Sequence, residues 1–351
     1  MVRMDCGILA IHFGEPPVPE RDVVTDYLTR IFYQNAELED ADSEEAARDR
    51  AAELADRRAP ALLEEYDEIG GSPMNEQARA QVAALDEQLT THGHEVRTEL
   101  AFQFLEPTIE EQIDAFAADD FDRLIILPIY PLCGPSTTVA AIDRTREAIE
   151  GQPHWDPEVH PISGWHRHPR YLQLRAATIR TFVNERGLDL GEPDTRLVFS
   201  AHGTPTHYLE SGSRYQIYVE EVSEAVANLL GGVEYELGYQ NHRNRDIPWT
   251  SPDIESVIEA MDGERVVVEP MSFMHEQSET LSELDLELAA DASASDIEFH
   301  RVPIPHDDER FPAILVDLVE PFVTGVDTTL YQFRACQCSP GSSCLNSPRG
   351  Q

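Results

Sequence analysis

The stretch Leu197–Pro205, LVFSAHGTP, constrains the fold of this 351-residue chain more than any other. Its apolar run stops abruptly at a small residue, a histidine, a glycine and a proline. Such a run is typical of a buried parallel strand, and open α/β folds build their sites at the carboxyl ends of these strands. We therefore expect His202 at the functional edge of a sheet. A lone histidine there is as often structural as catalytic, so a second feature has to decide.

Apolar runs of this kind alternate with helix-like segments through most of the chain. The first half reads strand, two helices, strand, helix, strand, helix, and the second half repeats the alternation. Strands that alternate with helices predict an α/β fold with parallel sheets. We expect two similar, doubly wound, Rossmann-like domains with a cleft between them.

The length also indicates two domains, because 351 residues are too many for one ordinary core. A Pro- and His-rich stretch at 151–169 punctuates the middle of the chain and holds a short strand. The expected units are an N-terminal α/β domain at 1–150, a C-terminal α/β domain at 151–307, a helix in 308–330 that packs back on the first domain, and a Cys-rich tail at 331–351. We expect the tail to be disordered unless something ties it down.

The composition is strongly acidic, with a net charge of −40 and no lysine among the 26 basic residues. Nucleic-acid binding needs concentrated positive charge, so the composition argues against this class of partner. Because the acids are spread along the whole chain, we interpret most of them as the solvated surface of a halophilic protein.

No apolar stretch approaches the roughly 18–20 residues of a membrane span. The N-terminal residues also lack the small-residue cleavage site of a signal peptide. We therefore expect a soluble, cytoplasmic protein. Its oligomeric state is left open by the sequence.

A second segment, Met271–Leu288, again runs from an apolar strand into polar residues. Glu279, Glu283 and Glu287 are spaced four residues apart and share one face if the segment is helical. Acids at this spacing usually form a solvated face, but the leucines between them leave little of the segment for solvent. In a partly buried helix, such carboxylates raise one another's pKa, pass protons or bind a cation. Together with an imidazole they suit Fe²⁺ or a similar divalent metal.

The five cysteines are unevenly placed, and three of them, Cys336, Cys338 and Cys344, lie in the tail. An odd number of cysteines in a cytosolic chain does not indicate a disulfide framework. Three thiolates cannot complete a four-coordinate metal site, so a fourth ligand has to come from elsewhere. Cys133, in a loop after a predicted strand, is the natural donor. The alternative is an unstructured tail with incidental cysteines.

Five segments resemble, in order, the signatures of the ferrochelatases, which insert Fe²⁺ into a porphyrin at the end of haem synthesis. They read YDEIGGSPMNEQ, ILPIYPLCGPSTT, LVFSAHGTP, YQN…DIPW and EPMSFMHEQSETLSELD, and the resemblance spans roughly residues 5–325. It implies two similar α/β halves with a cleft. It also implies that His202 and Glu279 face each other across the porphyrin, with Glu283 and Glu287 behind Glu279.

The resemblance further implies a mechanism for inserting Fe²⁺ into protoporphyrin IX or coproporphyrin III. Two pyrrole protons leave as the metal enters, and the cleft holds the ring ruffled so that its nitrogens are accessible. His202 would accept protons, and Glu279 would steer the metal or relay protons, with Glu283 and Glu287 leading to solvent. The expected contacts with the ring and its propionates are Phe13, Ser72, Tyr130, Trp249, Phe273, Met274 and, as a cation, Arg30.

Some ferrochelatases carry a [2Fe–2S] cluster held by three C-terminal cysteines and an internal one, and Cys336, Cys338 and Cys344 resemble that tail. Cys133 lies in the corresponding loop, displaced along the chain from the internal ligand of the animal enzymes. Phe13 stands where some coproporphyrin-metalating bacterial enzymes have a tyrosine, and a phenyl ring cannot coordinate a metal. Two other functions stay open at this point, namely a cobalt or nickel chelatase for another tetrapyrrole and a non-enzymatic porphyrin-binding protein.

The acidic surface generates a prediction about salt. Molar KCl screens charge repulsion beyond about 3 Å, so the melting temperature is expected to rise between low salt and molar KCl. Thermal denaturation followed by circular dichroism measures this, and an unchanged melting temperature would contradict the halophilic interpretation.

Overall fold

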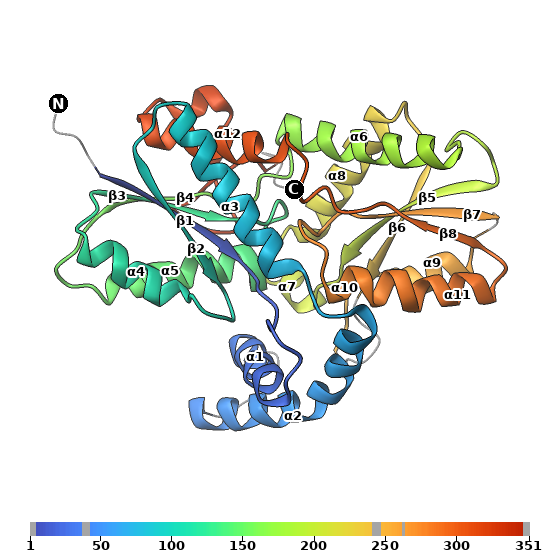
Figure 1. Ribbon diagram of the computed structural model, residues 1–351, viewed down its shortest axis with the longest axis horizontal. Coiled ribbons are helices and arrows are strands. Elements are labelled where there is room, and N and C mark those ends of the chain that lie inside the picture. The colour runs from blue at the N-terminus through green and yellow to red at the C-terminus, as the bar shows by residue number, and fades with distance from the viewer. Residues whose placement is uncertain (1–4, 37–42, 241–246, 262–263, 347–351) are drawn as a thin grey trace.

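The computed structural model describes residues 5–36, 43–240, 247–261 and 264–346 (Figure 1). It contains two four-stranded, fully parallel sheets, which confirms the predicted fold class. The first sheet has the order β2-β1-β3-β4 and the second has the order β6-β5-β7-β8, so the two sheets repeat one topology. The strands are β1 Cys6–His12, β2 Val96–Phe102, β3 Arg123–Pro128, β4 Glu158–Pro161, β5 Thr195–His202, β6 Tyr235–Gln240, β7 Arg265–Pro270 and β8 Glu298–Arg301.

Helices cover both faces of each sheet (Figure 1). Those of the first half are α1 Arg21–Gln34, α2 Glu44–Ile69, α3 Met74–Thr91, α4 Ile109–Ala118 and α5 Ala140–Glu150. Those of the second half are α6 Pro169–Arg186, α7 Thr206–Glu210, α8 Tyr215–Leu229, α9 Ile254–Glu259, α10 Ser278–Leu281, α11 Ala289–Ala294 and α12 Phe311–Thr324. Helices α1 and α2 pack on each other beside the two sheets rather than on a sheet face.

The two halves share one continuous core. Buried side chains of β1 and β5, such as Ile8 and Phe199, belong to the same cluster as those of α3, α6, α8 and α12. The opposite faces of the sheets have smaller clusters of their own, built with α4 and α5 in the first half and with α9 and α11 in the second. The shared cluster therefore fixes the carboxyl edge of one sheet relative to that of the other.

The first sheet extends beyond residue 150. The short strand expected in the stretch 151–169 is β4, and it pairs in parallel with β3. The predicted boundary at 150 is therefore too early, because the crossover through α5 returns the chain to the first sheet before α6 begins the second half. Helix α12 contacts both α3 and α6.

The tail is ordered through Asn346 because it adds to the fold. Its strands β9 Arg334–Ala335 and β10 Ser343–Cys344 form an antiparallel hairpin. The amide of Ser163 donates to the carbonyl of Ser343 at 2.8 Å, and the amide of Leu345 donates to that of Gly164 at 3.0 Å. A Cβ at Gly164 would lie 2.5 Å from Oδ1 of Asn346, so only glycine fits there.

Local signals mark helix ends to within a few residues. Thr108 and Glu111 form a capping box at the start of α4. Helix α3 begins at Met74 with Pro73 as its N-cap residue, although the sequence SPMNEQ also allows Ser72 in this position. The Ser72 hydroxyl instead accepts a hydrogen bond from the Met74 amide at 3.2 Å.

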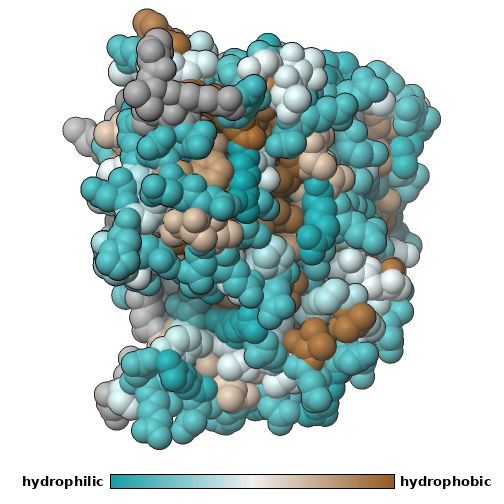
Figure 2. All heavy atoms as spheres, turned by 60° about the vertical axis from the view of Figure 1, so that its left-hand side comes forward, coloured by the Kyte–Doolittle hydropathy of each residue, from teal (hydrophilic) through white to brown (hydrophobic). Residues whose placement is uncertain are grey.

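Hydrophilic residues cover most of the face shown in Figure 2, with apolar atoms scattered or recessed among them. None of the described helices combines the length and the apolar character needed to cross a bilayer.

Candidate active site

A cavity of about 300 Å³ lies where the carboxyl ends of strands from both sheets meet. The segments after β1, β3, β5 and β7 line it, and α1 and α2 close it from the side. Ligand sites of open α/β sheets are found at this edge. The cavity lining includes these predicted residues: Phe13, Tyr130, His202, Trp249, Phe273, Met274, Glu279 and Glu283.

His202 is the last residue of β5, and its backbone is held on both sides. Its amide donates to the Ser272 hydroxyl at 2.8 Å, and its carbonyl accepts from the Tyr215 hydroxyl at 3.0 Å. The ring Nδ1 lies 2.5 Å from the carbonyl of Gly203. Because a carbonyl only accepts, Nδ1 carries a proton, which leaves Nε2 to face the cavity.

Nε2 of His202 lies 3.0 Å from Oε1 of Glu279. An unprotonated Nε2 and a carboxylate oxygen are both acceptors, so one proton between them makes this contact favourable. The pair thus holds a proton either on the imidazole or on the carboxyl group. About a third of the His202 side chain is exposed, so the pair stays accessible from the cavity.

Glu283 lies behind Glu279. Its Oε2 accepts from the side-chain amide of Gln240 at 3.3 Å, and the same amide donates to the Glu279 carbonyl at 2.9 Å. The carbonyl end of Gln240 is fixed in turn by the Ser200 hydroxyl at 2.6 Å. Burial raises the pKa of Glu283 well above its usual range, and the neighbouring charges of Glu279 and Glu65 add to the shift.

The three glutamates differ in exposure along the segment, and Glu279 and Glu287 both interact electrostatically with Glu283. Helix α10 ends at Leu281, and residues Glu283–Leu288 form a π-helical turn. Glu287 is exposed and is not among the cavity-lining residues. Leu286 is also 43% exposed, so the expectation that the leucines shield the segment is wrong at this end.

Other acids of this segment are structural. Arg301 donates to Glu276 at 2.8 Å and to Asp285 at 2.6 Å, so both carboxylates are paired on the side away from the cavity.

A buried ion pair supports the wall that carries Phe273 and Met274. Arg175 of α6 pairs with Glu269 of β7, and both side chains are almost fully buried. The guanidinium also donates to the carbonyls of Pro270 at 2.8 Å and Phe273 at 3.2 Å. Helix α6 therefore fixes the course of the chain as it leaves β7.

The expected propionate contacts, Ser72 and Arg30, do not line the cavity. Arg30 is paired with Asp26 on the exposed side of α1. Among the described residues, Arg58 of α2 is the arginine that lines the cavity, and its Nη2 lies 2.7 Å from Oε1 of Glu65. Sequence reasoning missed Arg58, because nothing local distinguishes it from the other arginines of that acid-rich helix.

Glu15 is a second residue that sequence reasoning missed. It follows the exit of β1 and is 5% exposed, yet it lines the cavity. Its carboxylate accepts from the hydroxyl of Ser278 at 2.5 Å and from the amide of Ser278 at 3.3 Å. Burial raises the pKa of Glu15 to about 7. An acid directly after a strand exit is the signal that drew attention to His202, so it was available for Glu15 as well.

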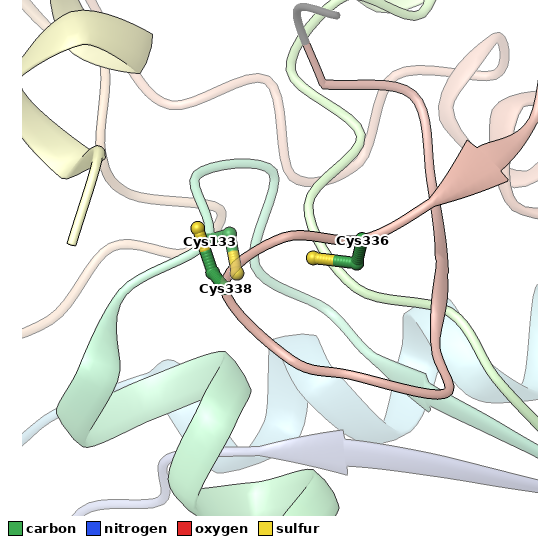
Figure 3. Close-up of side chains that lie close together, drawn as sticks. All are labelled: Cys133, Cys336 and Cys338. Carbon is green, nitrogen blue, oxygen red and sulfur yellow. The ribbon is translucent and has the colours of Figure 1, made fainter. Parts of the chain in front are cut away.

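The cysteines of the tail meet Cys133 in a second cluster. The sulfur atoms of Cys133, Cys336 and Cys338 lie within 4.8 Å of one another (Figure 3). Hydrogen bonds from Cys133, Cys338 and Cys344 lower the pKa of Cys336, which places the fourth thiol within reach of the same cluster. All four thiols are free of disulfides, so the donor set fits a thiolate-ligated metal group.

Comparison with known proteins agrees with this geometry. The sequence model described as "Ferrochelatase" matches residues 5–322. A ferrochelatase of a Nostoc species is 34% identical over 275 residues, which cover 76% of this chain and 70% of that protein. A ferrochelatase of Geotalea uraniireducens is 31% identical over 281 residues, which cover 78% of this chain and 85% of that protein.

Two solved structures align with the chain at low sequence identity, and the first of them shares its fold. A multi-domain protein of Deinococcus radiodurans, described as structurally similar to chelatases, aligns with a TM-score of 0.50 and 11% identity over 90% of this chain and 55% of its own. The cobalt complex of the sirohydrochlorin chelatase of Bacillus subtilis aligns with a TM-score of 0.48 and 12% identity, over 92% of this chain and 97% of its own. With the family match and these relatives, the chain belongs to the ferrochelatase family, the metal-chelating enzymes that insert iron into a porphyrin in haem synthesis.

Proposed function

We propose that His202 and Glu279 are the groups that exchange protons for Fe²⁺ on a porphyrin held in the cavity, either protoporphyrin IX or coproporphyrin III. The observation that carries this proposal is the 3.0 Å contact between Nε2 of His202 and Oε1 of Glu279 at the cavity wall. A pair that holds one proton in the absence of substrate is already arranged to take up and release protons.

The chemistry requires two pyrrole protons to leave as Fe²⁺ enters the ring. The proton that the pair already holds passes from Glu279 towards Glu283, which frees Nε2 of His202 to accept a pyrrole proton, because Nδ1 is already protonated and donates to the Gly203 carbonyl. Glu279 contacts the same nitrogen and takes the proton onward or receives the metal. Binding energy from the cavity walls would hold the ring ruffled, with the lone pairs of its nitrogens exposed.

Protons then leave through the buried acids behind Glu279. Glu283 is the next carboxyl group, and its high pKa suits it to hold a proton in transit. Glu65 and the exposed Glu287 both interact electrostatically with Glu283. Glu65 and Glu287 are our candidates for the solvent end of this proton path. Glu287 would then act near solvent, as expected, without touching the porphyrin.

Arg58 is our candidate partner for a propionate of the porphyrin. It is the arginine among the described residues that line the cavity, and 39% of its side chain is exposed. Its Glu65 partner neutralises it while no propionate is bound. A propionate would compete with Glu65 for the guanidinium, whose planar fork suits a carboxylate.

The two alternative functions, a porphyrin-binding protein and a cobalt or nickel chelatase, are less well supported. A protein that only binds porphyrin needs the cavity walls but not the chain of Glu279 and Glu283. A cobalt or nickel chelatase shares the histidine and the acids, and the match to the ferrochelatase family favours iron.

Metal insertion measured spectrophotometrically tests the roles of these residues. We expect the wild-type protein to metalate protoporphyrin IX or coproporphyrin III with Fe²⁺, and His202→Ala to lose about 10²–10⁴-fold in rate, because the proton acceptor is removed. His207→Ala is the matched control, since His207 is an exposed histidine nearby in the chain. Wild-type turnover with Co²⁺ but not Fe²⁺ would favour the other chelatase, no turnover would favour a binding protein, and an active His202→Ala would exclude His202 as the acceptor.

Glu15 fits a positioning role for Glu279, because it binds the amide and the hydroxyl of the preceding residue, Ser278. It also brings a further titratable group to the cavity. In the unfolded chain its carboxyl group titrates near 4.5, whereas in the folded protein its pKa is about 7. The folded state therefore keeps a proton that the unfolded state loses between these values, and this difference destabilises the fold as pH rises.

Glu15→Gln should remove that pH dependence. As pH rises from about 4.5 to about 7, the free energy of unfolding of the wild type should fall by about 3 kcal/mol relative to the variant, and the difference should stay level above that range. Urea unfolding at a series of pH values measures the two curves. Parallel curves would show that Glu15 titrates at its ordinary pKa.

We also propose that Cys133, Cys336, Cys338 and Cys344 bind a [2Fe–2S] cluster. Support comes from the convergence and burial of the thiols, with three of the four buried and Cys338 partly exposed. Such a group supplies electron-transfer chemistry or a structural crosslink when bound. Through the bound cluster, the four cysteines would join the hairpin β9–β10 to the loop after β3.

Protein purified without air should be brown and contain iron and acid-labile sulfide in equal amounts. Cys336→Ser should lose both, because Cys336 lies at the centre of the thiol contacts. Cys6→Ala is the control, since Cys6 is a buried cysteine in β1, outside the cluster. Colourless, iron-free wild-type protein from the same preparation would contradict the cluster.

A further inference from the structure

A third group of metal-binding side chains lies outside the cavity and the cysteine cluster. Nδ1 of His92 and Nε2 of His94 lie 3.1 Å and 2.8 Å from the same oxygen, Oε1 of Glu320. The three ligand atoms are all within 4.8 Å of one another. Two imidazoles and a carboxylate form a donor set that divalent transition metals prefer, and the two nitrogens converge on the same carboxylate oxygen.

The end of α3 brings the two histidines together. His92 is the C-cap residue, and Gly93 follows with a φ of +84°, a left-handed conformation that turns the chain sharply. The amide of His94 then donates back to the carbonyl of Leu89 at 3.0 Å, which completes the helix-ending motif. Both rings are thereby directed to the side where α12 packs against α3.

Glu320 comes from the last turns of α12, far away in sequence. Side-chain exposures of 48% for His92, 18% for His94 and 31% for Glu320 place the group at the surface with its base partly buried. A metal ion there keeps room for water in its remaining positions, as in sites with two histidines and one glutamate.

We infer that His92, His94 and Glu320 form a binding site for a divalent transition-metal ion of the Zn²⁺, Co²⁺ or Ni²⁺ class. The ion would crosslink the end of α3 to α12. The site is remote from the cavity, because His94 directly precedes β2 at the amino edge of the first sheet, whereas the cavity lies at the carboxyl edge. It is therefore separate from the path of the iron that enters the porphyrin.

Zinc binding to the full-length protein tests this inference. Equilibrium dialysis against Zn²⁺ in molar KCl, which suppresses loose binding to surface acids, should give one bound ion fewer per chain for His94→Ala and for Glu320→Gln than for the wild type. The melting temperature should rise with Zn²⁺ by on the order of 5 °C more in the wild type than in either variant. His154→Ala is the matched control, since His154 is an exposed histidine in another loop.

Co²⁺ gives an independent readout that separates this site from the thiols. The visible d–d bands of a Co²⁺ ion bound by nitrogen and oxygen should be lost in His94→Ala. The charge-transfer bands of the thiolates in the cysteine cluster should be the same in this variant and in the wild type. Iron insertion should be the same in both proteins. The inference is overturned if wild type, His94→Ala and Glu320→Gln bind equal amounts of Zn²⁺ and show equal shifts in melting temperature.

Discussion

The packing of two parallel sheets onto one shared core is the constraint on which the rest of the structure depends. Because α3, α6, α8 and α12 contribute to a single apolar cluster, the sheets cannot shift independently. Their carboxyl edges meet, and residues after β1, β3, β5 and β7 line one cavity. Neither half alone encloses the site, since His202 and Glu279 come from the second half and Phe13, Arg58 and Tyr130 come from the first.

The acidic side chains around this cavity are in different environments, which the net charge of the chain does not show. In a chain of −40, most acids are solvated, and several near the site are neutralised, as Glu276 and Asp285 are by Arg301. Glu279 and Glu283 are instead partly buried next to each other, and burial raises the pKa of Glu283. Their neighbour is His202, whose Nε2 lies 3.0 Å from Oε1 of Glu279.

The sequence predicts the parts of the site that follow from strand ends. An apolar run that ends in His202 predicts a buried strand with the histidine at its carboxyl end. Parallel pairing then puts such strand ends at one edge of the sheet. The place of Arg58 at the cavity depends on long-range packing, which leaves no local pattern, whereas Glu287 is exposed as expected for the outer end of the acids. The domain boundary was placed too early for a similar reason, because only pairing with β3 assigns β4 to the first sheet.

The anchoring of the tail has a consequence for how the molecule is completed during synthesis. Backbone hydrogen bonds with Ser343 and Leu345 hold the segment around Gly164. Oδ1 of Asn346 also lies 3.0 Å from Nδ1 of His166. The same segment packs on Cys133, in the loop that also presents Tyr130 to the cavity. The backing of one cavity wall is thus finished only when the tail through Asn346 has left the ribosome. A nascent chain released early would carry His202 and Glu279 but not the finished wall opposite them.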